Sequence, residues 1–345
     1  AELQAAKKPE AAEAWLREGI AAVKRSAMLG PDGRIQVGYL VNREDWGGAD
    51  WWSGRCSCNI DPDIEGGHGQ YVFDHWIGPQ VEGYRAAGAE YDGIGLDNFF
   101  SNARMLDFDR EHLAACDFPP TFAAGDFRPV VVGDTIMYEW VRELKSRLAA
   151  EGKWLMANTG HQPFPFNQHL LDMNGLEWGI ERTAPSTRTL AYHKQVVSLP
   201  VKPEHYEEHF IKMHLPMGAI PGGYGRIKEF ARDTEVGALY AKYVPILLRM
   251  QGAGWEPIPW ASCDSADVSL ERFGSALPLV FSLHNHAAES REVTVSVELA
   301  TLGAGAATVA SDLVEGADLG AKVVDGNLVF TTTLAGLDAT AVEVQ

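Results

Sequence analysis

The sequence predicts an α/β fold of the (β/α)8-barrel type, followed by an antiparallel β-sandwich domain. Two observations lead to this prediction. Between about residues 35 and 250, short apolar segments alternate with segments of helical period, which is typical of parallel strands joined by helices. After Pro259 the helical period disappears, and apolar and polar residues alternate over short segments, as in antiparallel sheets. We therefore expect a barrel domain over residues 1–259 and a β-sandwich domain over residues 260–345.

The barrel domain is expected to begin with an amphipathic helix over residues 9–29, which ends at the turn Gly30–Gly33. Apolar segments predict six strands of the parallel sheet, at residues 35–41, 91–97, 154–158, 176–181, 190–200 and 217–220. Helical spacing predicts the helices at residues 72–87, 134–151, 167–171, 203–212 and 234–250. A closed barrel of this type has eight strands. Either the first one or two β/α units are therefore absent, or the N-terminal segment supplies them.

The second domain is expected to consist of short strands without helices. Period-two alternation predicts these strands at residues 268–273, 279–283, 292–299, 307–310, 322–334 and 339–344. The segment over residues 322–334 is interrupted by Asp325-Gly326-Asn327, a typical turn sequence, so we expect a hairpin there.

Composition and charge exclude several classes of protein. Of the 345 residues, 46% are apolar and 22% charged, which is typical of a globular chain rather than a disordered one. The formal net charge of −18 disfavours nucleic acid and anionic membranes as partners, because both bind basic surfaces. No apolar segment of about 20 residues predicts a membrane span. Residues 1–8 lack the apolar core of a signal peptide, so we expect a cytoplasmic protein or one whose leader has been removed.

The four cysteines do not follow the spacing of a structural zinc site. Cys56 and Cys58 form a Cys-x-Cys pair, and Cys116 and Cys263 are isolated. We therefore expect buried thiols, without disulfides, a metal or a cofactor. The eleven histidines contain no His-Glu-x-x-His motif, and the chain has no Gly-x-Ser-x-Gly motif of a serine hydrolase.

The segment Tyr91–Asn98 carries the strongest functional signal. Its apolar run between a glycine and an acid predicts a central parallel strand that is buried on both faces and ends at Asp97. Barrel enzymes place their catalytic groups at the carboxyl ends of their strands. Two other predicted strands also end on polar residues, at Asn158 and at Glu181.

A pair of carboxylates at these strand ends predicts the hydrolysis of glycosidic bonds. One carboxyl acts as the acid toward the leaving oxygen, and the other acts as the nucleophile or as the base for water. We assign these roles to Asp97 and Glu181, with Glu177 as the alternative, because it lies on the same side of the predicted strand but deeper. The structural alternative is that each acid caps a helix or pairs with an arginine, such as Arg104 or Arg182.

Aromatic and polar residues in the loops after the strands suit a saccharide, because sugar rings pack their C–H faces on aromatic planes. The tryptophans could equally serve only to anchor long loops. The candidate substrate-binding residues are Asn98, Asn158, His161, Trp46 and Trp52, with His193, Lys194 and Tyr224 as weaker candidates.

Several segments together resemble a glycoside hydrolase of the TIM-barrel type. They are Asp92–Asn98, Leu155–Gly160, Gly175–Glu181 and the β-rich tail, with Asn59–Asp63 and Asp117–Phe122 as further loop segments. They are most similar to an incompletely characterised group of glycosidases related to endo-α-polygalactosaminidases. The resemblance implies a catalytic pair on the fourth and sixth strands, here Asp97 with Glu181 or Glu177. It also makes residues 35–41 the third strand, so the first two have no obvious counterpart.

We therefore expect a glycosidase that degrades an oligo- or polysaccharide, with the carbohydrate as its substrate and with neither nucleic acid nor a membrane as a partner. A homo-oligomer that completes or covers the barrel is a further expectation. Two alternatives remain open. One is a non-catalytic saccharide-binding protein with an incomplete barrel, and the other is a carbohydrate lyase or isomerase that uses a carboxylate together with Lys194.

Overall fold

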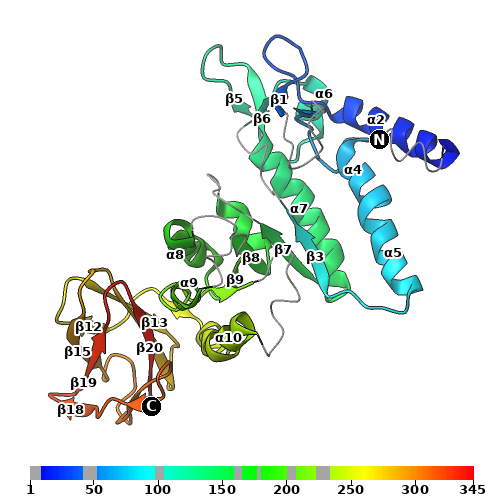
Figure 1. Ribbon diagram of the computed structural model, residues 1–345. Helices are drawn as coiled ribbons and strands as arrows, with labels where there is room; N and C mark the ends of the chain where they lie inside the picture. Colours follow the sequence, from blue (N-terminus) through cyan, green and yellow to red (C-terminus); the bar gives the residue numbers. More distant parts are fainter. Residues whose placement is uncertain are drawn as a thin grey trace. The chain divides into compact units, whose positions relative to one another are not determined.

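The computed structural model describes residues 9–41, 53–97, 105–158, 165–176, 180–199, 207–222 and 234–345. The chain folds as two compact units (Figure 1). The first unit comprises residues 1–94 and 100–155, and the second comprises residues 95–99 and 156–345. The predicted division at residue 259 falls inside the second unit and stays a prediction. Among the described residues, no helix has both the length and the apolar character needed to cross a bilayer.

The first unit is mainly helical, with two small antiparallel sheets. Its helices are α2 (Pro9–Ser26), α4 (His68–Val72), the π-helix η1 (Phe73–Ile77), α5 (Gly78–Ala86), α6 (Arg110–Ala115) and α7 (Gly133–Ala150). Its strands are β1 (Val37–Val41), β2 (Ser53–Cys56), β4 (Leu106–Asp107), β5 (Thr121–Phe122) and β6 (Pro129–Val132). Strand β1 pairs antiparallel with β2, and β6 pairs antiparallel with both β4 and β5.

The pairing of β1 corrects one prediction. Residues 35–41 were expected to form a strand of the parallel sheet, but β1 lies in a separate antiparallel pair. Its partner β2 has the sequence Ser-Gly-Arg-Cys, which carries no apolar alternation and therefore gave no strand signal.

Helix α7 forms the centre of the first unit because its apolar residues recur every four positions. Ile136, Trp140, Leu144 and Leu148 lie on one face and are buried. The Trp140 ring stacks on Phe73 of η1 with 5.1 Å between the ring centroids, and its Nε1 donates to the carbonyl oxygen of Gly69 at 3.2 Å. These contacts hold α4 and η1 against α7.

The parallel sheet has five strands within the described ranges. They are β3 (Gly93–Leu96), β7 (Trp154–Asn158), β8 (Met173–Leu176), β9 (Gln195–Ser198) and β10 (Ile220–Pro221), in the spatial order β10-β9-β8-β7-β3. The parallel α/β organisation is confirmed for these strands. Among them the sheet is open, with β3 and β10 at its edges, and no closed barrel is seen. Among the described residues, β3 has a neighbour on one side only, and its residues are partly exposed rather than buried on both faces as predicted.

Two predicted strands around residue 185 are wrong in their boundaries. Strand β8 ends at Leu176, and residues 180–191 form helix α8 (Ile180–Ala191). The segment predicted as one strand over residues 190–200 therefore contributes only Gln195–Ser198 to the sheet. Pro185 lies inside α8 and concealed it, because a proline in a helix interior is unfavourable. The other helices of this part are η2 (Pro165–Leu170, of the 3-10 type), α9 (Glu208–Lys212) and α10 (Glu235–Ala253).

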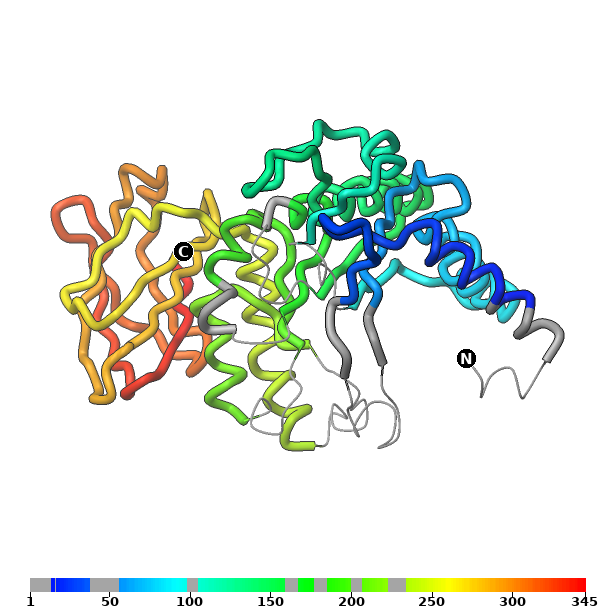
Figure 2. The backbone as a smooth tube through the Cα atoms, turned by 90° about the horizontal axis from the view of Figure 1, so that it is seen from above, coloured from blue at the N-terminus to red at the C-terminus, as the bar shows by residue number. Residues whose placement is uncertain are grey.

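The C-terminal part consists of two antiparallel sheets (yellow to red in Figure 2). One has the order β11-β13-β14-β20-β16-β17 and the other β12-β15-β19-β18. The strands are β11 (Trp255–Glu256), β12 (Ala261–Cys263), β13 (Val268–Phe273), β14 (Leu279–Asn285), β15 (Arg291–Glu298), β16 (Ala310–Asp312), β17 (Ala317–Asp318), β18 (Lys322–Val324), β19 (Asn327–Leu334) and β20 (Ala339–Val344). Side chains from both sheets form one core, among them Phe281, Val295 and Phe330.

The first of these sheets is covered on its other face by helices. Leu247 and Met250 of α10 pack against Phe273 and Val280. With both faces covered, all six residues of β20 are buried, although a strand with one solvated face should alternate. The helices of the parallel part and this sheet therefore share a core within the second unit.

Candidate active site

The carboxyl edge of the parallel sheet brings two predicted site residues together. Asp97 follows the last residue of β3, and Asn158 is the last residue of β7. The side-chain amide of Asn158 donates from Nδ2 to Oδ1 of Asp97 over 2.9 Å. Asn158 is buried, whereas Asp97 is exposed. An anchored amide therefore holds a carboxylate that solvent, or a ligand, can reach.

Strand β3 can lie against β7 because residue 93 is a glycine. A Cβ atom on Gly93 would lie 2.1 Å from the carbonyl oxygen of Trp154, which is far closer than any real contact. Trp154 also donates its backbone amide to the carbonyl of Asp92. Because Asp92 adjoins Trp154 and Asp97 adjoins Asn158, the two strands run in the same direction. Gly93 thus has a packing role that places Asp97 at the edge.

The strand register assigns each residue to one face of the sheet. Asn158 is paired with Gly175, and Gly175 with Val197, so these three share a face. Leu176 and Val196 share the opposite face and pack with Ala191 of α8. The side chain of Asn158 therefore lies on the face opposite to α8.

A serine–histidine pair lies at the same edge and was missed by the sequence analysis. Ser198, the last residue of β9, has its Oγ 2.6 Å from Nε2 of His214, and both residues are buried. Nδ1 of His214 lies 3.0 Å and 3.1 Å from the carbonyl oxygens of Phe210 and Ile211. Nδ1 therefore carries a proton, and Nε2 can accept the hydroxyl proton of Ser198. Sequence offers no periodic signal for this contact, because the two residues are 16 positions apart.

Two of the predicted site residues lie away from this edge, and a third lies in a helix. His193 and Lys194 directly precede β9, so they lie at its amino end rather than beside Asp97. His193 is exposed with its Nε2 3.7 Å from Oε1 of Glu256, and Lys194 Nζ donates to the carbonyl of His169. Glu181 belongs to the first turn of α8 and not to the end of a strand. The remaining candidates lie outside the described residues: Asn98, His161, Trp46, Trp52, Tyr224 and Glu177.

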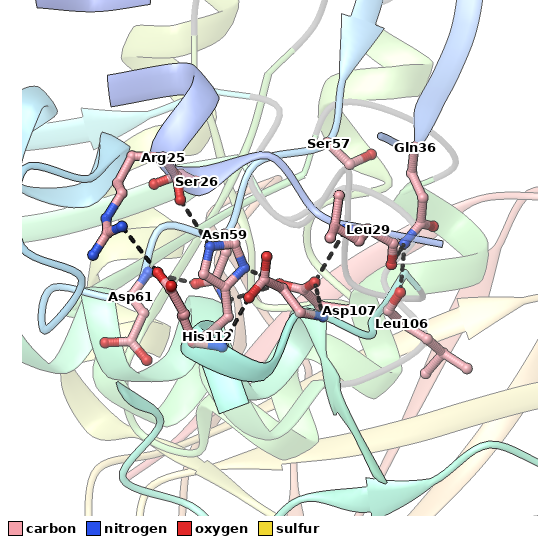
Figure 3. Close-up of polar contacts among 12 residues, drawn as sticks. Arg25, Ser26, Leu29, Gln36, Ser57, Asn59, Asp61, Leu106, Asp107 and His112 are labelled. Atoms are coloured by element: carbon pink, nitrogen blue, oxygen red, sulfur yellow. Dashed lines mark hydrogen bonds and ion pairs between the residues drawn. The ribbon is translucent and has the colours of Figure 1, made fainter. Parts of the chain in front are cut away.

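A second polar cluster is buried in the first unit around the carboxylate of Asp107 (Figure 3). Two backbone amides donate to its Oδ1, each over 3.1 Å. Its Oδ2 accepts from Nδ2 of Asn59 at 3.1 Å and lies 2.6 Å from Nδ1 of His112. The other ring nitrogen of His112 lies 2.8 Å from the carbonyl oxygen of Arg25. Both ring nitrogens therefore face acceptors, which an imidazolium satisfies by donating twice.

Electrostatics around His112 agree with this arrangement. Burial by itself lowers the pKa of His112, but the hydrogen bonds to Asp107 and to the carbonyl of Arg25 outweigh it and raise the pKa above its ordinary value. The cluster joins α2, α6 and the loop after β2. Because its polar atoms are bonded to one another, we assign it a structural role.

The sequence matches no family model and no curated protein. Three similar solved structures are glycosidases by name. A variant of a GH27 β-L-arabinopyranosidase from Geobacillus stearothermophilus, in complex with arabinose, is 11% identical, with 77% of each chain covered and a TM-score of 0.40. α-Galactosidase I from Mortierella vinacea is 9% identical over 77% of this chain and 90% of that one, with a TM-score of 0.44. The α-amylase from H. orenii is 8% identical over 95% of this chain and 74% of that one, with a TM-score of 0.47. At this level of similarity they identify no site residue.

Proposed function

We propose that this protein is a glycoside hydrolase that cleaves a glycosidic bond in an oligo- or polysaccharide at the carboxyl edge of its parallel sheet. The observation that carries the proposal is the hydrogen bond from Asn158 to Asp97, which holds an exposed carboxylate at the end of a parallel strand. Parallel α/β enzymes bind their substrates at this edge. The segments that resemble TIM-barrel glycosidases include both residues.

Glu177 is the better candidate for the second carboxylate. It directly follows Leu176, the last residue of β8, as Asp97 directly follows Leu96 of β3. Side chains alternate along a strand, and in the sequence Glu177 has the same strand parity as Gly175, which pairs with Asn158. Glu181 has no such relation to the sheet, because α8 has begun by then. The sequence analysis preferred Glu181 over Glu177 as the second carboxylate, and we now prefer Glu177 over Glu181.

In the proposed reaction, Asp97 acts as the nucleophile or as the base for water, and Glu177 protonates the leaving oxygen. Asn158 fixes one oxygen of the Asp97 carboxylate, which leaves less rotational freedom to be lost when the sugar binds. A separation of about 5 Å between the two carboxyl groups would give retention of configuration, and about 6.5–9.5 Å would give inversion.

Three single variants test the assignment: Asp97→Asn, Glu177→Gln and Glu181→Gln. Purified full-length proteins are assayed on a panel of aryl glycosides and polysaccharides. We expect hydrolysis by the wild type and by E181Q, and a loss of at least about 100-fold in kcat for D97N on every substrate and for E177Q on the polysaccharides. Equal activity in all four proteins would contradict the assignment.

The leaving group separates the two roles. An aryl glycoside with an acidic phenol needs little protonation, so E177Q should keep most of its activity on that substrate and lose it on an unactivated disaccharide. D97N should lose both activities. If the wild type binds sugars but releases no product from any of them, the protein is a saccharide-binding protein and not a hydrolase.

A further inference from the structure

Three side chains with metal-binding atoms converge in the first unit, and the proposed hydrolase site uses none of them. They are Asp61, Cys116 and Glu139, and one oxygen or sulfur atom from each lies within 4.8 Å of the other two. Asp61 lies in the loop after β2, Cys116 directly follows α6, and Glu139 lies on α7. Three separate parts of the chain therefore supply the cluster.

Both carboxyl groups are buried and incompletely bonded. Asp61 is 0% exposed and Glu139 is 1% exposed. Within the described residues, Oδ2 of Asp61 and Oε2 of Glu139 accept no hydrogen bond from a backbone amide or another donor side chain. A buried carboxylate is costly unless it is paired or coordinates a metal, so the two groups either share a proton with each other or hold a cation together.

The other oxygen of each carboxyl group is fixed by the protein. Oδ1 of Asp61 accepts from the backbone amide of Asp63 at 2.9 Å, and the amide of Asp61 itself donates to Oδ1 of Asn59 at 2.9 Å. Oε1 of Glu139 accepts from Sγ of Cys116 at 3.0 Å and from the amide of Phe118 at 3.3 Å. Asn59 is in turn held by Asp107, so the network of Figure 3 positions one side of the cluster. Such supporting bonds are typical of groups that orient metal ligands.

An arginine near the cluster is already paired with a carboxylate outside it. Arg142, one turn after Glu139 on α7, pairs with Asp117 at 2.5 Å. A divalent cation would bring positive charge to the two buried carboxyl groups.

The cluster borders a cavity at Glu139. A cavity of about 470 Å³ is lined by Glu139 and by charged residues around it, among them Asp63, Asp117 and Arg142. Since Glu139 belongs both to the cluster and to the cavity wall, the cluster lies directly behind this part of the wall. The cavity also leaves room for a water molecule or an anionic group beside a bound ion.

We propose that Asp61, Cys116 and Glu139 bind one Zn²⁺ ion and leave its fourth position open toward this cavity. Zinc is the ion that the ligands favour, because it takes thiolate and carboxylate together and is four-coordinate. Calcium and magnesium bind oxygen ligands and have little affinity for a thiolate. The cysteine spacing predicted a protein without a bound metal, and zinc binding at this cluster would contradict that prediction.

Isothermal titration of tag-free, chelator-treated protein with Zn²⁺ alone tests the proposal. We expect one ion per chain, and binding weakened at least about tenfold in Cys116→Ser and in Glu139→Gln. Two matched controls should bind as the wild type does. Cys263→Ser removes a thiol from the second unit, and Glu143→Gln removes an exposed carboxylate one turn along α7.

Co²⁺ provides a second readout that requires no variant. Bound through Cys116, it should give a sulfur-to-metal charge-transfer absorption, and Zn²⁺ should displace it. The proposal is overturned if the wild type binds no Zn²⁺ or if Co²⁺ shows no sulfur ligation. It is also overturned if folded C116S and E139Q bind zinc as tightly as the wild type. The cluster would then be a buried carboxyl pair that shares protons with a thiol.

Discussion

The side-chain amide of Asn158, at the end of β7, donates a hydrogen bond of 2.9 Å to the carboxylate of Asp97, which directly follows β3. The two residues are 61 positions apart in the chain, and the sheet brings them together. Asn158 is buried and Asp97 is exposed, so the bond connects the interior of the sheet to the surface at which we place the substrate.

Removal of this amide should affect catalysis more than folding. In Asn158→Ala the Asp97 carboxylate loses its anchor, so we expect kcat to fall by about 10- to 100-fold with a smaller change in KM. Steady-state kinetics on a glycoside that the wild type hydrolyses measure both values. If kcat is retained while KM rises, Asn158 binds the sugar directly and does not position Asp97.

Gly93 is expected to be irreplaceable for packing reasons. Gly93→Ala would bring Cβ to 2.1 Å from the carbonyl oxygen of Trp154, so we expect a loss of about 3 kcal/mol or more in the free energy of unfolding. Gly95→Ala is the matched control, because a Cβ there meets nothing within 4 Å. Denaturant unfolding of both variants checks this. Similar values for the two would show that β3 moves away from β7 at little cost.

The pair of Asp107 and His112 makes stability depend on pH in a defined direction. Because the folded state raises the pKa of His112, the stabilisation is complete below the ordinary histidine pKa of about 6.5 and is lost as pH rises through the higher folded value. His112→Gln should cost about 3 kcal/mol at low pH. The difference between wild type and variant should shrink as the pH rises above the ordinary histidine pKa of about 6.5. Urea unfolding across this range measures it, and a difference that grows with pH would contradict the assignment.

Arg188 should contribute more to stability than an exposed arginine. It pairs with Glu271 at 2.9 Å, donates to the carbonyl of Pro216 at 2.7 Å and lies 4.6 Å from the ring centre of Trp255. Its side chain is buried, so Arg188→Ala should cost about 3 kcal/mol. Arg291→Ala, which breaks a largely exposed pair with Asp267, should cost less than about 1 kcal/mol. In thermal unfolding, the Tm of Arg188→Ala should therefore lie clearly below that of Arg291→Ala.

The extent to which the sequence predicted this fold depended on how local the signal was. The predicted boundaries of β13 and β20 agree with those in the structure. In both segments, alternation of apolar and polar residues over six positions is enough to indicate a strand. Helix α8 was missed because Pro185 interrupts its pattern, and β1 was assigned to the wrong sheet because strand pairing is not a local property. The position of β3 at the edge of the described parallel sheet could not be predicted either, because it also depends on strand pairing.

The candidate site divides in a similar way. Asp97 and Asn158 were recognised because each stands at the end of an apolar run, where the strand end and the polar residue coincide. Ser198 with His214, and Asp61 with Cys116 and Glu139, come from elements that only the tertiary structure brings together. No spacing rule covers them. His193 and Lys194 were weaker candidates near a strand expected over residues 190–200, and the structure places both of them before β9.

The position of β20 has a consequence for the order in which the second unit can assemble during translation. This strand is the last along the chain, yet it lies between β14 and β16 in the middle of its sheet. Until residues 339–344 have left the ribosome, β14 lacks its neighbour, and the surface under α10 is incomplete. A nascent chain that ends before residue 339 therefore holds β13, β14 and α10 without their final partner, and the second unit can reach its native packing only after residues 339–344 have been made.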